Sequence, residues 1–198
     1  MNRRLRLIAV LTVLGGGALA LIGSTQTWLV VALREGGREP LTVPGADAVA
    51  MLAALSLAAL ALGLALTIVG RVLRYLFGLL ALAIAGTLLV ASWRVAAEQP
   101  IDAYMSTVAE ATGLTGAQAV GELVDTVAVT PWPVITIGAA LLVAVGGVLT
   151  LATAHLWSRT GRRYRTDAAI VASSEGSRPH DAIDSWDDLS RGEDPTDR

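Results

Sequence analysis

The sequence predicts an all-α membrane protein with four transmembrane helices, both termini cytoplasmic, a small helical extracytoplasmic cap and a disordered acidic tail. Two observations predict this class. Hydrophobic residues make up 54% of the 198 residues and gather in long runs, whereas soluble domains carry roughly 45–50% in dispersed form. Arginine collects beside alternate ends of these runs, which is the pattern of loops that stay in the cytoplasm.

Four apolar runs each come close to the ~20 residues that a helix needs to cross a bilayer. They are Leu7–Val31, Ala48–Val69, Tyr75–Ala91 and Val134–Leu156. The runs hold no Asp, Glu, Lys or Arg, so the sequence does not indicate an ion pathway or a proton relay inside a span. The short link Gly70–Arg74 joins the second and third runs and predicts an antiparallel helical hairpin.

Arginine placement predicts the orientation of the spans. Nine arginines flank the predicted inner ends of the four-helix region 1–165, namely Arg3, Arg4, Arg6, Arg71, Arg74, Arg159, Arg162, Arg163 and Arg165. Only Arg34, Arg38 and Arg94 flank the outer ends. The positive-inside rule therefore places both termini in the cytoplasm of a multi-pass cell-membrane protein.

The N-terminus carries a second interpretation. Met1–Ala20 has a basic start, an apolar stretch and an Ala18-Leu19-Ala20 triplet that resembles the cleavage site of a signal peptide. The apolar stretch continues through Leu21-Ile22-Gly23, which favours a retained first helix.

Tryptophan marks the predicted ends of the spans. Trp28, Trp93 and Trp132 fall at outer ends and Trp157 at an inner end. Amphipathic rings favour the headgroup level, so all four are predicted to be interface anchors. The alternative is that these rings pack in the core of a soluble fold.

The two outer loops differ in size. The first, Leu33–Asp47, is polar, and Leu41-Thr42-Val43 within it has an extended pattern. The second, Arg94–Pro131, predicts two short helices separated at Gly113. Their apolar faces would be Ile101, Met105 and Val108, and then Val120, Leu123, Val124 and Val127, with Thr115 and Gln118 as a capping box. We expect a small cap over the outer mouth of the bundle; a pair of helices resting on lipid headgroups is the alternative. Thr130-Pro131-Trp132-Pro133 marks the start of the fourth helix.

Small residues recur at fourfold spacing in two spans. One ridge is Gly16, Ala20 and Ser24; the other is Ala46, Ala50, Ala54 and Ala58. Such ridges let helices approach closely in lipid. Packing within the bundle is the favoured interpretation, and the interface of a homo-oligomer is the alternative. The polar residues of the spans are predicted to bond to their own preceding turn; they are Thr12, Ser56, Thr67, Thr87, Thr136, Thr150 and Thr153.

The sequence indicates no enzyme. It has no cysteine, no zinc-ligand spacing, no nucleophile elbow, no phosphate loop and no dinucleotide fingerprint. We therefore expect no catalytic residues, no cofactor, no metal and no nucleic-acid partner. His155 reads as an interfacial residue beside Trp157.

The tail, residues 166–198, is acidic and too poor in apolar residues to fold alone. A candidate docking peptide occupies 183–196, because Ile183, Trp186 and Leu189 share one face of a short helix. The remaining candidate partner-binding residues are Asp187, Arg191, Gly192, Glu193, Asp194 and Pro195. The alternative is a solvated tail with an incidental Trp.

This closing stretch, Trp186-Asp187-Asp188-Leu189-Ser190-Arg191-Gly192-Glu193-Asp194-Pro195-Thr196, resembles the C-terminus of the actinobacterial tryptophan-biosynthesis-associated membrane proteins. Asp188 and Ser190 depart from the Ala and Asp more often expected there. Three shorter landmarks are similar too: Thr25-Gln26-Thr27-Trp28, Leu41-Thr42-Val43-Pro44-Gly45 and Pro131-Trp132-Pro133. The resemblance implies a membrane protein of the tryptophan-operon region and brings no catalytic residues.

Two functions follow as hypotheses. The first is a membrane anchor or interaction protein whose tail peptide binds a cytosolic partner. The second is a small transporter or channel component for an apolar solute such as indole or tryptophan, motivated by the polar-poor bundle beneath an outer cap.

Overall fold

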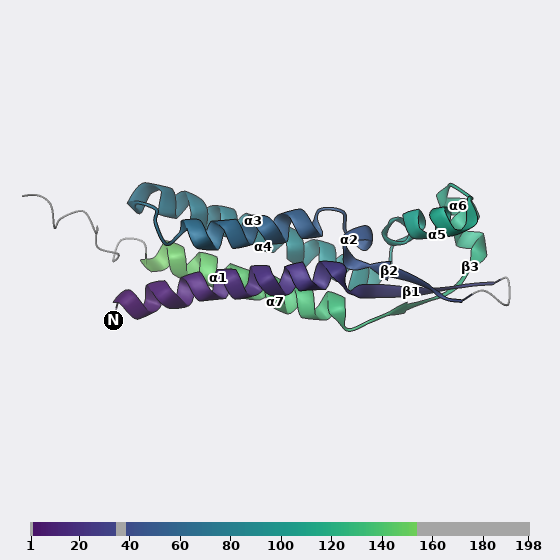
Figure 1. Ribbon diagram of the computed structural model, residues 1–198, viewed down its shortest axis with the longest axis horizontal. Coiled ribbons are helices and arrows are strands. Elements are labelled where there is room, and N and C mark those ends of the chain that lie inside the picture. Colours follow the sequence, from purple (N-terminus) through teal and green to yellow (C-terminus); the bar gives the residue numbers. More distant parts are fainter. Residues whose placement is uncertain (1, 35–38, 154–198) are drawn as a thin grey trace, which may run out of the picture. The chain divides into compact units, whose positions relative to one another are not determined.

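The computed structural model describes residues 2–34 and 39–153, which form a long helical bundle with a small sheet at one end (Figure 1). Its helices are α1 (Asn2–Thr25), α2 (Gly45–Ala48), α3 (Leu52–Ala65), α4 (Arg71–Glu98), α5 (Met105–Thr112), α6 (Ala117–Leu123) and α7 (Trp132–Thr153), with a 3-10 helix η1 (Ile101–Ala103). Its strands are β1 (Thr27–Leu33), β2 (Leu41–Pro44) and β3 (Val124–Val129). We call the end of the bundle that bears these strands the sheet end and the other the N-terminal end.

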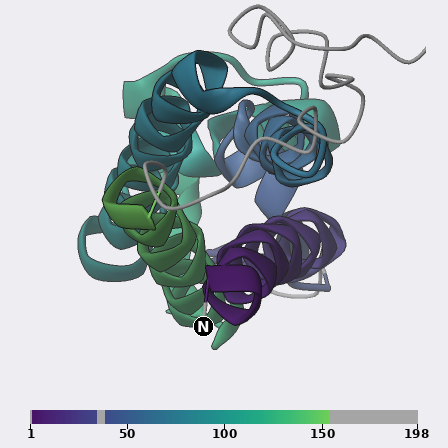
Figure 2. The same ribbon diagram turned by 90° about the vertical axis from the view of Figure 1, so that its left-hand side faces the viewer.

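The long helices pack in the order α3, α1, α7, α4 around the bundle (Figure 2). Glycine makes the central contacts close: a Cβ built on Gly16 of α1 would lie 2.6 Å from the Ala139 carbonyl oxygen of α7. A Cβ on Gly147 of α7 would lie 3.1 Å from Leu82 of α4. By contrast, α3 and α4 touch each other little. The bundle is therefore held together mainly through α7 and α1.

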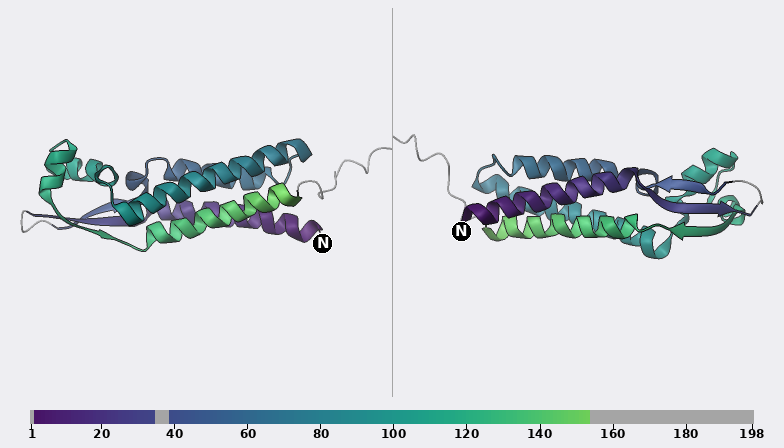
Figure 3. Two further views of the ribbon diagram at one scale, coloured as in Figure 1. Left: turned by 180° about the vertical axis from the view of Figure 1, so that it is seen from behind. Right: turned by 60° about the horizontal axis from the view of Figure 1, so that its bottom comes forward.

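The sheet is antiparallel in the order β2-β1-β3. Val30 of the central strand faces Thr42 on one side and Ala128 on the other. Because β1 follows α1 directly and β3 leads into α7, the sheet prolongs that helix pair beyond the bundle, as both views of Figure 3 show. The helices α5 and α6 pack beside it, with Val108 and Val120 fully buried.

The structure is mostly helical, as predicted, but it is not all-α, because two segments predicted as helix are strands. The first run was expected to continue as a helix to Val31, yet α1 ends at Thr25 and Thr27–Leu33 is β1. Val124 and Val127 were expected on a helical face and belong to β3. Both segments are rich in β-branched residues, which favour strands once a partner strand is available. The extended pattern of Leu41–Val43 agrees with β2.

The lengths of the helices also differ from the prediction. Three helices, α1, α4 and α7, are long and apolar enough to cross a membrane. The run Ala48–Val69 is not one continuous helix: α3 has 14 residues and is about 21 Å long at ~1.5 Å per residue. Conversely, α4 has 28 residues and extends past both ends of the predicted span Tyr75–Ala91.

The polar residues of the spans behave as predicted. Each of them donates a hydrogen bond to a carbonyl three or four residues earlier, for example Ser56 to Leu52 at 2.7 Å and Thr150 to Gly146 at 2.7 Å. The other donors are Thr12, Thr67, Thr87, Thr136 and Thr153. Such local bonds remove the cost of a polar group in an apolar surrounding.

Two arginines bind the carbonyls that follow α3 at the N-terminal end. Arg6 of α1 donates to the Thr67 carbonyl, and buried Arg74 of α4 donates to the Val69 carbonyl at 2.8 Å. Both carbonyls belong to the turn that follows Ala65, the last residue of α3, so the guanidinium groups hold α1 and α4 to this turn. Arg74 therefore lies inside the first turn of α4 and not in the link before it.

The two small-residue ridges have different outcomes. Gly16, Ala20 and Ser24 are buried between helices, as packing within the bundle predicts. Ala50, Ala54 and Ala58 are exposed, and α3 instead buries Leu52, Ser56, Ala59 and Leu62. The prediction that the second ridge packs inside the bundle is therefore wrong, because the Leu and Ser positions form the inward face.

Candidate functional site

A buried cluster of side chains surrounds Trp28, where the bundle meets the sheet. This ring is fully buried, and its Nε1–H donates a hydrogen bond to the Gly23 carbonyl at 2.8 Å. Gly45 packs directly against it: a Cβ there would lie 2.6 Å from Trp28 Nε1. The prediction that Trp28 anchors the chain at the lipid interface is therefore wrong, because the turn after α1 folds the ring inward.

Three short motifs that are far apart in the sequence meet at this point. The Gly45 amide donates to the Gln26 carbonyl at 2.9 Å, which ties β2 to the turn after α1. The Thr130 amide donates to the Trp28 carbonyl at 2.9 Å, and its hydroxyl donates to the Thr27 carbonyl at 2.7 Å. Two of the motifs that resemble family landmarks, and the residue directly before the third, thus meet at one junction. We name Gly23, Trp28, Gly45 and Thr130 the Trp28 junction.

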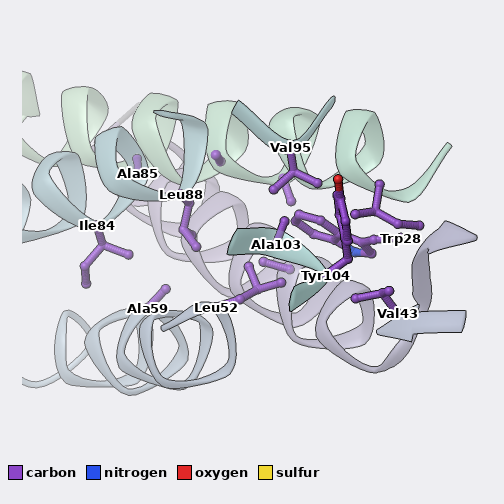
Figure 4. Packing of buried hydrophobic residues seen from close by; sticks show 14 of the residues in the cluster. Trp28, Val43, Leu52, Ala59, Ile84, Ala85, Leu88, Val95, Ala103 and Tyr104 are labelled. Atoms are coloured by element: carbon purple, nitrogen blue, oxygen red, sulfur yellow. The ribbon is translucent and has the colours of Figure 1, made fainter. Parts of the chain in front are cut away.

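Tyr104 lies next to Trp28 in the same cluster, together with Val43, Val95 and Ala103 (Figure 4). Burial raises the pKa of the Tyr104 hydroxyl above its ordinary value of 10.0, so this side chain is neutral at physiological pH. Leu52, Ala59, Ile84 and Leu88 continue the cluster into the bundle. The Trp28 junction is therefore part of a buried apolar cluster that connects the bundle to the sheet.

A cleft of about 260 Å³ lies beside the Trp28 junction, where α3, α4 and η1 come together. Met51, Leu55 and Val95 give it apolar walls, and Thr87, Arg94 and Asp102 are its polar groups. Arg94 Nε lies 3.6 Å from Glu98 Oε2, one helical turn further along α4. The cleft thus combines apolar walls with one cationic and one anionic side chain.

The other predicted interface anchors divide into three outcomes. Trp93 of α4 is 59% exposed, as an anchor requires. Trp132 at the start of α7 is half-buried and packs against the main core cluster. Trp157 lies outside the described residues, as does His155.

The candidate docking peptide also lies outside the described residues. This applies to every residue predicted in it, from Ile183 and Trp186 through Leu189 to Pro195. Within residues 2–34 and 39–153, no group of three or more His, Asp or Glu side chains is arranged to hold a metal ion. The predicted capping box of α6 is wrong, because Gly116 occupies the N-cap position with a φ of 111°.

The cleft was missed in the sequence because its residues come from three separate segments. One signal was available: Arg94 is the only basic residue in the acidic stretch Arg94–Pro131. The Trp28 junction has a clearer signal in the sequence, because Thr25-Gln26-Thr27-Trp28 and Leu41-Thr42-Val43-Pro44-Gly45 are distinct short motifs. Their convergence depends on the strand pairing, which the sequence pattern did not reveal.

Comparison with known proteins gives one match. A family model described as Tryptophan-associated transmembrane protein matches residues 10–196, which is nearly the whole chain. No curated protein and no solved structure matches the chain significantly.

Proposed function

The chain belongs to the family of tryptophan-associated transmembrane proteins, and on that premise we propose that it is a non-enzymatic membrane anchor that presents its C-terminal peptide to a cytosolic partner. The observation that carries the anchoring part is the close packing of α1 against α7. Gly16 and Gly146 hold α1 against α7 at distances that leave no room for a methyl group. The hydroxyls of the spans bond to their own helices, which favours an anchor over a polar passage.

The orientation is part of this proposal. The turn between α3 and α4 lies at the same end as the start of α1 (Figure 1), and both places carry arginines. The positive-inside rule then assigns the N-terminal end to the cytoplasm and the sheet end to the outside. In this arrangement α3 is the fourth crossing element, because it runs beside α1 although it is shorter than the other three.

The tail supplies the contact with the partner. Trp186 and Leu189 on one helical face would bury apolar area worth ~1.5–3 kcal/mol for each side chain. Ordering the tail costs about 2–5 kcal/mol, so we expect a weak contact that is easily regulated. We propose a cytosolic enzyme of tryptophan synthesis as the partner, in keeping with a family described as tryptophan-associated.

Crosslinked capture from native membranes tests the proposal. We compare the intact chain, a chain truncated after Arg165, and the variant Trp186→Ala, each with equal amounts in the membrane. The expected result is a cytosolic protein that the intact chain captures and both altered chains lose. As a matched control, Trp93→Ala removes an exposed Trp outside the tail and leaves capture unchanged. Equal capture by all chains would contradict the docking role.

Transport of indole or tryptophan is the second function considered from the sequence. In its favour stands the cleft beside the Trp28 junction, which provides apolar walls at one end of the bundle. Purified chain in liposomes would then increase solute flux with the tail removed. Flux equal to that of empty liposomes leaves the anchor as the sole proposal.

A further inference from the structure

The cleft between α3, α4 and η1 has a composition that membrane packing does not require. A crossing between helices in lipid is usually filled by small apolar side chains. Here the walls include Arg94 and Asp102, which carry opposite charges, beside Met51, Leu55 and Val95. Both charged side chains are exposed at the edge of the cleft. In ligand sites a few polar groups among apolar walls fix the orientation of the ligand.

Arg94 retains binding capacity. Its Nε faces Glu98 at 3.6 Å, and a guanidinium has five N–H donors in a planar fork suited to a carboxylate. That salt bridge leaves the terminal nitrogens to other acceptors. Asp102 supplies an acceptor for an ammonium group from the neighbouring η1. The charged part of the cleft thus matches a molecule that carries both a carboxylate and an ammonium.

The size and the apolar walls of the cleft indicate which side chain the ligand carries. About 260 Å³ is slightly less than the ~300–1,000 Å³ of sites for drug-sized molecules, so the cleft holds one small molecule. Met51, Leu55 and Val95 favour an apolar or aromatic side chain on it. A phospholipid matches less well, because two acyl chains need far more room than this volume offers.

We propose that this cleft binds one free α-amino acid with an apolar or aromatic side chain, with its carboxylate on Arg94 and its ammonium on Asp102. The site lies at the sheet end of the bundle, where α4 meets the Trp28 junction through Val95. The proposal is independent of the docking role of the tail, since it involves no residue beyond Asp102.

Binding of radiolabelled L-tryptophan and L-leucine to the full chain in phosphatidylcholine nanodiscs tests this site. We expect saturable binding of at least one of them with a dissociation constant below about 1 mM. Competition by analogues measures what each charged group of the ligand contributes to binding. Tryptamine lacks the carboxylate, indole-3-propionate lacks the ammonium, and indole lacks both. Each should compete at least tenfold more weakly than the amino acid.

Three variants address the residues themselves. Arg94→Gln and Asp102→Asn should each weaken binding at least tenfold, while Ala91→Leu should block the cleft without changing a charge. Arg34→Gln is the matched control, because Arg34 is exposed at the same end but does not line the cleft. Gel filtration and thermal unfolding confirm that each variant is folded, and Arg94→Lys should bind better than Arg94→Gln.

Several results would overturn the proposal. They are absence of saturable binding by the intact chain, equal losses in Arg34→Gln and Arg94→Gln, and competition by indole as strong as by the amino acid. Retention of a phospholipid that no amino acid displaces would assign the cleft to lipid instead.

Discussion

Single glycines set how closely the long helices approach. Gly16 and Gly15 are neighbours in α1, but a Cβ on Gly16 would lie 2.6 Å from the Ala139 carbonyl, whereas one on Gly15 meets nothing within 4 Å. Overpacking of this kind costs about 1–3 kcal/mol, and Ala in place of Gly gains at most ~1 kcal/mol of helix propensity. The clash should outweigh the gain at Gly16 because its nearest neighbour is backbone.

We therefore expect Gly16→Ala to lower the unfolding temperature of the purified protein, and Gly15→Ala to leave it unchanged or slightly higher. Thermal unfolding in detergent, followed by circular dichroism, measures both. Equal unfolding temperatures for the two variants would show that α1 and α7 do not touch at Gly16.

Trp28 is the second residue whose environment yields a prediction. Trp28→Phe removes one of two donors to the Gly23 carbonyl, which still accepts from the Gln26 amide at 3.3 Å, and a net hydrogen bond contributes about 0.5–1.5 kcal/mol. The smaller ring also leaves part of a fully buried site unfilled. The variant should therefore unfold at a clearly lower temperature in the same assay. Trp93→Phe, on a ring that is 59% exposed, is the control and should have little effect. A larger loss at Trp93 than at Trp28 would contradict the buried junction.

Local chemistry decided which residues could be predicted. The hydrogen bonds of Ser56 and Thr150 were predictable because they depend only on the preceding turn. The outward direction of Ala54 was not, since it depends on which neighbours α3 meets. Trp28 was misassigned for the same reason: an amphipathic ring suits a lipid interface and a buried hydrogen bond equally well.

At the scale of elements, the helices were largely predictable and the sheet was not. At the end of α1 the apolar run is interrupted only by the uncharged polar residues Ser24-Thr25-Gln26-Thr27 and resumes at Trp28, so hydropathy alone extends the helix to Val31. Strand β1 forms because β2 and β3 pair with it, and β3 comes from a segment almost a hundred residues later in the chain. Such pairings are nonlocal and leave no periodic signal in a short strand.

The pairing of β1 with β3 can be tested directly, because the natural chain has no cysteine. Val30 and Ala128 are direct partners across the two strands. The double variant Val30→Cys/Ala128→Cys should form a disulfide under mild oxidation, detected by a shift on non-reducing gels. The control pair Val30→Cys/Thr126→Cys is displaced by two residues, since Thr126 faces Ala32, and should crosslink far less. Equal crosslinking of both pairs would argue against this register.

At the scale of the whole molecule, we propose a bundle that crosses the membrane, with the sheet end outside and the tail in the cytoplasm. The arginine asymmetry predicts this arrangement, and α1, α4 and α7 have the length it needs. Among the four proposed spans, α3 is the shortest. Its 14 residues are fewer than the ~20 of a usual span. Its crossing depends on the adjoining segments around Met51 and Leu66, and on the arginines that bind the turn after it.

The most direct measurement is the accessibility of single cysteines to a membrane-impermeant maleimide in intact cells. Gly70→Cys lies in the turn between α3 and α4 with open space for its side chain, Thr115→Cys is exposed beyond the sheet end, and Ser177→Cys marks the tail. The cysteine-free natural chain is the control. We predict labelling of Thr115→Cys in intact cells, and of Gly70→Cys and Ser177→Cys only after the membrane is opened. Labelling of Gly70→Cys and Thr115→Cys from the same side would contradict the account, because α3 and α4 would then not cross.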